Sequence, residues 1–189
     1  MPKIISLIQR VYICCMKIYL MGFMGSGKST IGILLSRLMK TDFIDFDRNL
    51  EREEGKSIAE IFDTLGEEKF RALEHLHLKK ILSKDNVVVS LGGGTPCFHN
   101  NMEMINQSGV SVFLETDTAT LAKRLLKEKN DRPLIRGLNE KELNHFIESS
   151  LAKRMPVYTK ADHTVKGENK SPENIAQTIR KLISEKSEA

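Results

Sequence analysis

The chain is 189 residues long and 40% apolar, which is enough for one domain with a complete hydrophobic core. Its formal net charge is +4, but the basic residues are scattered among acidic ones and no Trp is present to stack on bases, so we expect small anionic ligands and no nucleic-acid partner. The three cysteines have neither metal-site spacing nor an even disulfide framework, which favours a reducing, cytoplasmic setting.

Residues 1–15 are apolar enough to resemble a targeting segment. Their longest uncharged stretch, residues 4–9, is shorter than the core of a secretion signal or a membrane span, so we expect neither export nor a membrane partner. Because Met16 directly precedes the first predicted strand, we divide the chain into an N-terminal extension, 1–15, and a domain, 16–189. The start is Met1 or Met16, and the sequence leaves open whether the extension packs on the domain or is not translated.

Apolar runs and helical periodicity alternate along the rest of the chain. Strands are predicted at residues 18–21, 43–46, 87–91, 110–114 and, more weakly, 163–165. Helices are predicted at residues 28–39, 66–83, 118–128, 140–154 and 173–184, the last introduced by Ser171 as N-cap and by Pro172. Strands separated by helices predict an α/β fold with a parallel sheet covered on both faces. Ligands are then expected at the carboxyl ends of the strands.

The sequence GFMGSGKS, residues 22–29, lies between the first predicted strand and the first predicted helix. Its glycines let successive N–H groups approach phosphate oxygens, and the following helix directs its positive end at the same anion. Lys28 would neutralise the β- and γ-phosphates, and the Ser29 hydroxyl suits Mg²⁺. A glycine-rich surface loop is the alternative, but the complete pattern in this setting predicts a nucleoside triphosphate site.

Two carboxylates end the second predicted strand, in the sequence Asp45-Phe46-Asp47. Alternation along a strand would put both on one face at its carboxyl end, where the γ-phosphate is expected. One could hold Mg²⁺ through water, and the other could accept a proton from an attacking hydroxyl. Asp47 would in addition cap a short helix over residues 48–54.

Three consecutive glycines, Gly92 to Gly94, follow the third predicted strand. They predict a place where a ligand touches bare backbone, with a tight turn as the plain alternative. Arg71 and Arg154 fall on predicted helices, where a lone arginine is usually a surface side chain.

Residues 127–139 are charged, contain Arg132-Pro133 and lie between two predicted helices. Composition alone favours a solvated loop. In an ATP-binding protein, however, the length of the segment and its arginine predict a mobile lid that closes over the phosphates. His75 and His77 look like helix-surface residues and are assigned no role.

Together these residues resemble the shikimate kinases, from about Met16 to the last helix. The motifs that carry the resemblance are residues 22–30, Asp45-Phe46-Asp47, residues 55–62, residues 66–74, the triple glycine, Arg132-Pro133-Leu134 and residues 153–158. The resemblance implies a single-domain P-loop kinase with a five-stranded parallel sheet, of the nucleoside monophosphate kinase type. Phe46 is bulkier than the Thr common in the family, but it should point away from the two aspartates.

The activity implied by the resemblance is transfer of the γ-phosphate of ATP to the 3-hydroxyl of shikimate, a step of chorismate and aromatic amino acid biosynthesis. Asp47 would bind the substrate hydroxyls and act as base, while Arg71 and Arg154 would clamp the carboxylate with their planar guanidinium forks. The backbone at Gly92, Gly93 and Gly94 would also meet the substrate.

On the ATP side, Lys28 and Arg132 are implied in catalysis, Arg132 by descending with the lid. The residues implied in ATP binding are Gly25, Ser26, Gly27, Lys28, Ser29, Thr30, Arg132 and Lys170. The adenine contact stays open between Lys170 and Arg124. Mg²⁺ is the implied cofactor, bound by Ser29 directly and by Asp45 through water.

Two other functions fit part of the pattern. Another small P-loop metabolite kinase, such as a gluconate kinase, shares the loop and sheet but has no evident need for two arginines against a ring carboxylate. A regulatory module that hydrolyses ATP as a switch would need a partner surface, for which residues 1–15 are the candidate. We expect a monomer that uses ATP and shikimate.

Overall fold

A computed structural model describes residues 16–128, 135–167 and 170–186. The N-terminal extension and part of the predicted lid, Arg132 included, lie outside the described residues. The described chain contains a five-stranded parallel sheet in the order β2-β3-β1-β4-β5, as expected from the alternation of strands and helices. Its strands are β1 Lys17–Met21, β2 Asp42–Asp45, β3 Val87–Ser90, β4 Val110–Glu115 and β5 His163–Lys166.

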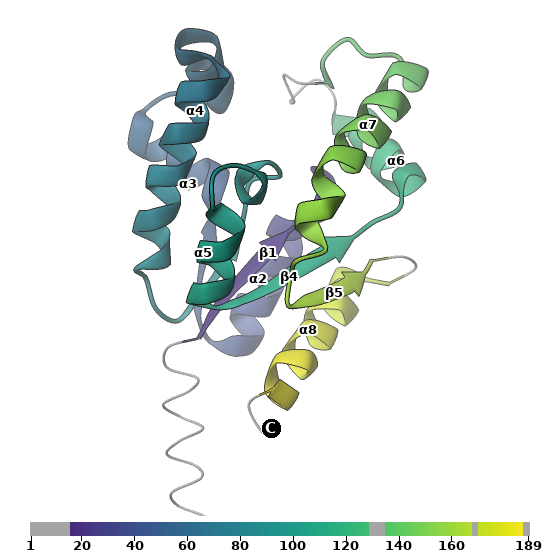
Figure 1. Ribbon diagram of the computed structural model, residues 1–189. Coiled ribbons are helices and arrows are strands. Elements are labelled where there is room, and N and C mark those ends of the chain that lie inside the picture. The colour runs from purple at the N-terminus through teal and green to yellow at the C-terminus, as the bar shows by residue number, and fades with distance from the viewer. Residues whose placement is uncertain (1–15, 129–134, 168–169, 187–189) are drawn as a thin grey trace, which may run out of the picture.

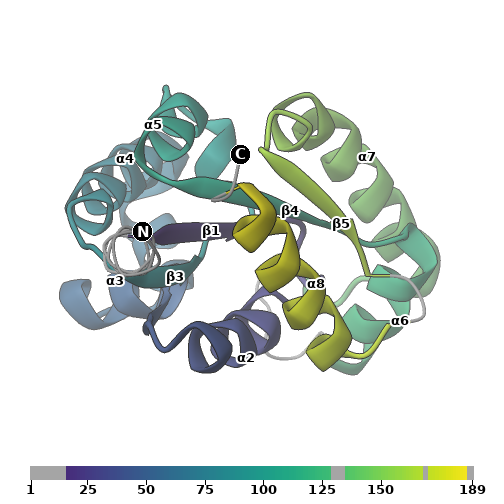
Figure 2. The ribbon, with the colours of Figure 1, turned by 90° about the horizontal axis from the view of Figure 1, so that it is seen from below.

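Helices cover both faces of this sheet (Figure 2). α2 (Lys28–Met39) and α8 (Pro172–Lys186) lie on one face, and α4 (Ile58–Leu82), α5 (Asn101–Ser108) and α7 (Glu140–Tyr158) lie on the other. Side chains of β1 alternate between the two apolar cores: Ile18 and Leu20 pack toward α2 and α8, whereas Tyr19 and Met21 pack toward α4, α5 and α7. Because both faces are covered, the strands are buried on both sides.

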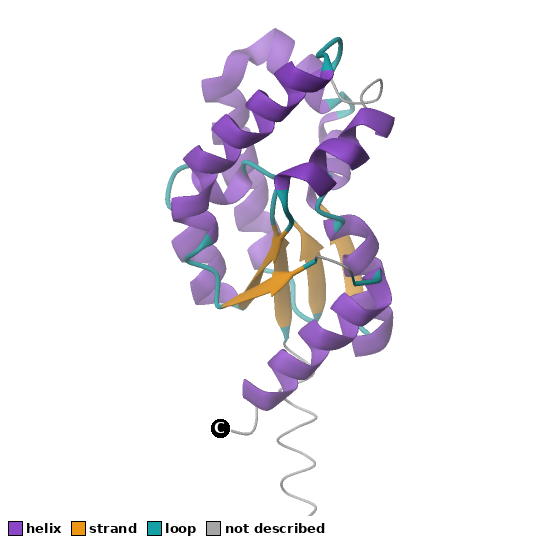
Figure 3. Ribbon diagram, turned by 90° about the vertical axis from the view of Figure 1, so that its right-hand side faces the viewer, coloured by secondary structure: helices purple, strands orange, loops and turns teal. Residues whose placement is uncertain are grey.

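Two helical pairs extend past the carboxyl edge of the sheet (Figures 1 and 3). One joins α3 (Phe46–Glu54) to α4 through a small core of Leu50, Ile61 and Phe70. The other joins α6 (Thr118–Glu128) to α7 through a second core around Phe23 and Leu125. The space between the two pairs lies above the carboxyl ends of the strands, where a ligand was expected.

Several helix boundaries differ from those predicted. α4 begins at Ile58, behind a capping box of Ser57 and Glu60, and residue 66 is a break inside it, because Gly66 has φ 76° and ψ 170°. α7 continues through Pro156 to Tyr158. α5 and the short 3₁₀ turn η1 (Thr95–Cys97) were not predicted. None of the helices in the described ranges is long and apolar enough to cross a membrane.

Candidate active site

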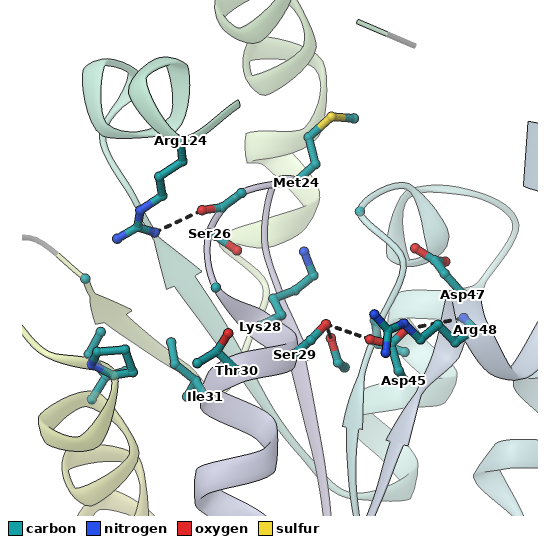
Figure 4. Close-up of a pocket in the computed structure, with 18 of the residues that line it drawn as sticks. Met24, Ser26, Lys28, Ser29, Thr30, Ile31, Asp45, Asp47, Arg48 and Arg124 are labelled. Carbon is teal, nitrogen blue, oxygen red and sulfur yellow. Dashed lines mark hydrogen bonds between the residues drawn. The ribbon is translucent and has the colours of Figure 1, made fainter. Parts of the chain in front are cut away.

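A pocket of about 690 Å³ opens at the carboxyl edge of the sheet (Figure 4). Its walls come from the loop after β1, the start of α2, the ends of β2 and β3, α6 and the start of α8. The whole predicted ATP-binding set within the described residues lines it, namely Gly25, Ser26, Gly27, Lys28, Ser29, Thr30 and Lys170.

The loop between β1 and α2 has the conformation its glycines allow. Gly25 and Gly27 have φ of 81° and 90°, a region that residues with a Cβ seldom enter. Gly27 is the N-cap of α2 and supplies no side chain, so the first N–H groups of the helix are left for a ligand. Lys28 Nζ donates to the carbonyl oxygens of Gly22 and Phe23, both at 3.0 Å, which holds the ammonium group over the loop.

Ser29 and Asp45 form one cluster of oxygen ligands beside this loop. Ser29 Oγ donates to Asp45 Oδ2 at 2.6 Å and lies 3.4 Å from Ser90 Oγ (Figure 4). Hydroxyl and carboxylate oxygens are the hard ligands that Mg²⁺ prefers, and Mg²⁺ usually completes its shell with water and phosphate oxygens. The donor set therefore fits the predicted metal.

The sequence predicted that both aspartates lie on one strand, and this prediction is wrong. Asp45 ends β2 and caps α3, its Oδ1 accepting from the Arg48 N–H at 3.3 Å, so Asp47 is not the cap. Asp47 lies in the first turn of α3, and the turn of this helix, not strand alternation, brings its carboxylate to the pocket. Phe46 is fully buried in the core and points away from both, as expected.

The environment of Asp47 makes its carboxylate unusually basic. The side chain is open to the pocket, but neighbouring protein crowds it: a Cβ placed on Gly92 would lie 2.5 Å from Asp47 Oδ1. Loss of solvent, followed by the negative charge of Glu74, raises the pKa of Asp47 to about 6, while the positive charge of Lys28 lowers it. A carboxylate with this pKa is suited to accept a proton near neutral pH.

Both predicted arginines reach the triple glycine. A Cβ on Gly93 would lie 3.1 Å from Arg154 Nη1, and one on Gly94 would lie 2.8 Å from Arg71 Nη1. The missing side chains are thus what allows two guanidinium groups, from α7 and α4, to lie against one loop. The Arg154 guanidinium also lies over the Phe23 ring, 5.3 Å from its centroid.

Arg71 is fixed by contacts that sequence reasoning missed. Its Nη1 lies 2.5 Å from Oε2 of Glu74, which is almost fully buried, and its guanidinium stacks on Phe98 at 4.0 Å. Glu74 Oε1 accepts from Thr95 Oγ1 at 2.6 Å, which links α4 to the loop after β3. The only sequence signal was the spacing of three residues between Arg71 and Glu74, which on an exposed helix would be an ordinary surface pair.

Both adenine candidates line the pocket. Arg124 Nη1 donates to the carbonyl oxygen of Gly25 at 2.9 Å, and Lys170 is an exposed residue just before α8.

His77 was expected on the helix surface, and this prediction is wrong. It is buried beside Phe46, with its Nδ1 3.3 Å from Glu53 Oε2. Because α3 lies over this part of α4, a histidine that looks exposed on one helix becomes part of the core.

A parallel sheet of this order, with a phosphate-binding loop after β1 and a second cationic site beside it, defines a P-loop kinase of the nucleoside monophosphate kinase type. The family model for shikimate kinase matches residues 24–184, and the chain belongs to the shikimate kinase family.

Relatives match nearly the whole chain. The shikimate kinase of Parabacteroides distasonis is 42% identical over 167 residues, which cover 88% of this chain and 96% of that protein. A crystal structure of shikimate kinase from Bacteroides thetaiotaomicron superposes with a TM-score of 0.85 at 37% identity, covering 89% of this chain and 98% of the other. The structure of shikimate kinase from Acinetobacter baumannii in complex with shikimate superposes with a TM-score of 0.84 at 32% identity, covering 94% of this chain and 97% of the other.

A gluconokinase from Sinorhizobium meliloti is much less similar. It superposes with a TM-score of 0.59 at 18% identity and covers 92% of this chain and 94% of its own. This likeness extends to the fold alone.

Proposed function

We propose that the protein transfers the γ-phosphate of ATP to the 3-hydroxyl of shikimate, giving shikimate 3-phosphate and ADP, a step of chorismate and aromatic amino acid biosynthesis. The observation that carries this proposal is the meeting of Asp47, Arg71 and Arg154 around the triple glycine, at the side of a pocket that contains the phosphate loop. A carboxylate base and two guanidinium groups suit a substrate with a hydroxyl at one end and a carboxylate at the other.

In this proposal Asp47 accepts the proton of the 3-hydroxyl as that oxygen bonds to the γ-phosphorus. The bond from the γ-phosphorus to the β–γ bridging oxygen breaks, and its electron pair stays on ADP. Lys28 neutralises the charge on the phosphates from its place over the loop. Phosphoryl transfer depends on positioning and charge more than on covalent help, and orientation alone can supply about 7–11 kcal/mol of barrier reduction.

The carboxylate of shikimate would lie between Arg71 and Arg154, with the backbone of Gly92, Gly93 and Gly94 beside the ring. Glu74 supports this arrangement, because its ion pair with Arg71 Nη1 holds that nitrogen beside Gly94. Paired guanidinium groups bind a carboxylate by charge-assisted hydrogen bonds, which are stronger than neutral ones.

Mg²⁺ would be held by Ser29 directly and by Asp45 through water, consistent with their shared 2.6 Å hydrogen bond. When bound, it would draw charge from the β- and γ-phosphates. Arg124 and Lys170 would bind the adenosine side of ATP, and Arg132 would approach the transferring phosphoryl group. A monomer and a cytoplasmic setting belong to the same proposal, the setting because the cysteine pattern favours a reducing compartment.

A substrate panel tests this function and its two rivals. ADP production is coupled to NADH oxidation in the presence of ATP and Mg²⁺, with shikimate, gluconate or no acceptor. Turnover that depends on shikimate is expected. Turnover with gluconate alone would favour the sugar-acid kinase, and equal ADP release without acceptor would favour the nucleotide switch.

A further inference from the structure

A buried tyrosine at the end of α7 contacts the triple glycine. Tyr158 is fully buried and packs on Phe113, with ring centroids 5.0 Å apart. Its hydroxyl donates a 2.5 Å hydrogen bond to the carbonyl oxygen of Gly93. Tyr158 follows Arg154 by four residues, so the two side chains lie on the same face of α7 and approach the same glycine.

The peptide between Gly93 and Gly94 needs an anchor of this kind. A Cβ on either residue would press on the guanidinium group of Arg154 or Arg71, so glycine at both positions leaves room for the two arginines. A peptide unit with glycine on both sides has few steric barriers to rotation, so its plane can turn over at little cost. The hydrogen bond from a rigid, packed tyrosine removes that freedom.

Holding the carbonyl also sets the direction of the neighbouring N–H. In a trans peptide the C=O and the following N–H point to opposite sides, and the described chain has no cis peptide. With the Gly93 oxygen turned to Tyr158, the Gly94 N–H points away from Tyr158. Within the described residues neither the Gly93 nor the Gly94 N–H has an acceptor, so both are left for a ligand.

We propose that Tyr158 is a positioning residue for the acceptor substrate, which acts by fixing the Gly93–Gly94 peptide so that the Gly94 N–H faces the ring or carboxylate of that substrate. The inference rests on the proposed function and adds to it a residue that touches neither ATP nor shikimate. Burial raises the pKa of Tyr158 to about 12, although the charge of Arg154 lowers it, so the hydroxyl stays a donor across the working pH range.

Tyr158→Phe tests the proposal against Tyr19→Phe as matched control. Tyr19 is also fully buried in the same core, and its hydroxyl bonds Ser108 Oγ at 3.0 Å, away from the pocket. We expect Tyr158→Phe to raise the KM for shikimate about fivefold, as for one lost hydrogen bond, and to leave the KM for ATP within about twofold. Tyr19→Phe should change neither KM, while both variants lower the melting temperature.

Equal effects of the two variants on the KM for shikimate would overturn the proposal, as would an equal rise in both KM values for Tyr158→Phe. A second measurement uses the wild-type protein in case the variant does not fold. Saturating shikimate without ATP should slow amide hydrogen exchange at Gly94, and unchanged exchange there would contradict the proposal. Absence of any wild-type turnover with shikimate would instead overturn the proposed function itself.

Discussion

Arg71 Nη1 lies 2.5 Å from Glu74 Oε2, so a cation that faces the active-site loop is held by a carboxylate that is almost fully buried. This pairing fixes the direction of the guanidinium group before any substrate arrives. Removal of Arg71 would leave the buried Glu74 carboxylate without its ion-pair partner, which costs stability as well as function. Arg71 without Glu74 would keep its ion pair with Glu67 at 3.2 Å.

The carboxylate clamp gives the first prediction. Arg154→Ala should weaken shikimate binding by more than tenfold, because loss of one partner of a partly desolvated charge pair costs on the order of 2–5 kcal/mol. Arg71→Ala should do the same and also lower the melting temperature, since Glu74 loses its partner. ATP affinity should hardly change, and Arg180→Ala, at an exposed site on α8, is the control. Calorimetric titration gives both affinities.

A neutral analogue sharpens this test. If the arginines bind the carboxylate, each substitution should cost less with the carboxamide of shikimate than with the acid. Equal penalties on acid and amide would mean that these arginines do not recognise the carboxylate.

Asp47→Asn tests whether Asp47 acts as the general base or belongs to the metal site. Loss of a general base typically lowers the rate about 10²–10⁴-fold, so kcat should fall by at least the lower bound, with weaker shikimate binding and an unchanged KM for ATP. Steady-state kinetics with each substrate varied in turn measures all three. A rise confined to the KM for ATP would assign Asp47 to the metal site and leave Asp45 as the candidate base.

The raised pKa of Asp47 predicts a pH-dependent stability. Below pH 3.8 the carboxyl is protonated in both folded and unfolded protein; between 3.8 and about 6 the folded protein alone keeps the proton, so the unfolding free energy falls as pH rises. Well above pH 6 the carboxyl is ionised in both states, and the loss of unfolding free energy has reached its full size. Thermal melting should therefore show Asp47→Asn gaining stability over wild type at pH 8, with the gain disappearing near pH 4; an equal difference at both pH values would contradict the shift.

Lys28→Ala tests the phosphate loop. The substitution removes the charge expected at the β- and γ-phosphates and should abolish most of the activity, while the fold stays intact because Lys28 Nζ lies over a loop at the pocket, where it donates to the Gly22 and Phe23 carbonyl oxygens. Turnover and melting temperature are compared with Lys79→Ala, an exposed lysine on α4. Near-normal turnover would rule out the nucleotide assignment.

Ser29→Ala tests the metal site. Loss of the hydroxyl should raise the Mg²⁺ concentration for half-maximal activity about tenfold, the usual scale for a lost ligand-shell contact. Chelation with EDTA should stop turnover of the wild type, and Mg²⁺ should restore it. Ser83→Ala, whose hydroxyl donates to the Lys80 carbonyl oxygen at the end of α4, is the control. An unchanged Mg²⁺ response in Ser29→Ala would place the metal elsewhere.

The parts of the fold that depend on local signals could be predicted from the sequence. The helices at 28–39 and 118–128 have the predicted bounds, because a glycine turn or an aspartate cap marks the start of each. α5 was missed because only Met102 and Ile105 of its eight residues supply buried apolar side chains, too few to show a period.

Tertiary contacts explain the other misses. The sequence could not show that α3 starts one residue after Asp45, which decides which aspartate caps and which faces the pocket. Glu74 and His77 look like surface residues on an isolated helix, and only the packing of α4 against its neighbours buries them. Tyr158 lay beyond the predicted end of its helix at residue 154, whereas α7 continues through Pro156 to Tyr158.

Competition between two acceptors in one tube shows directly which substrate the protein phosphorylates. The protein is incubated with ATP, Mg²⁺ and equal concentrations of shikimate and gluconate, and the phosphorylated products are identified by ³¹P NMR. We expect one phosphate ester, on the 3-hydroxyl of shikimate, formed in equal amount to ADP. A gluconate ester, a phosphate on another hydroxyl, or ADP with inorganic phosphate as the sole product would contradict it.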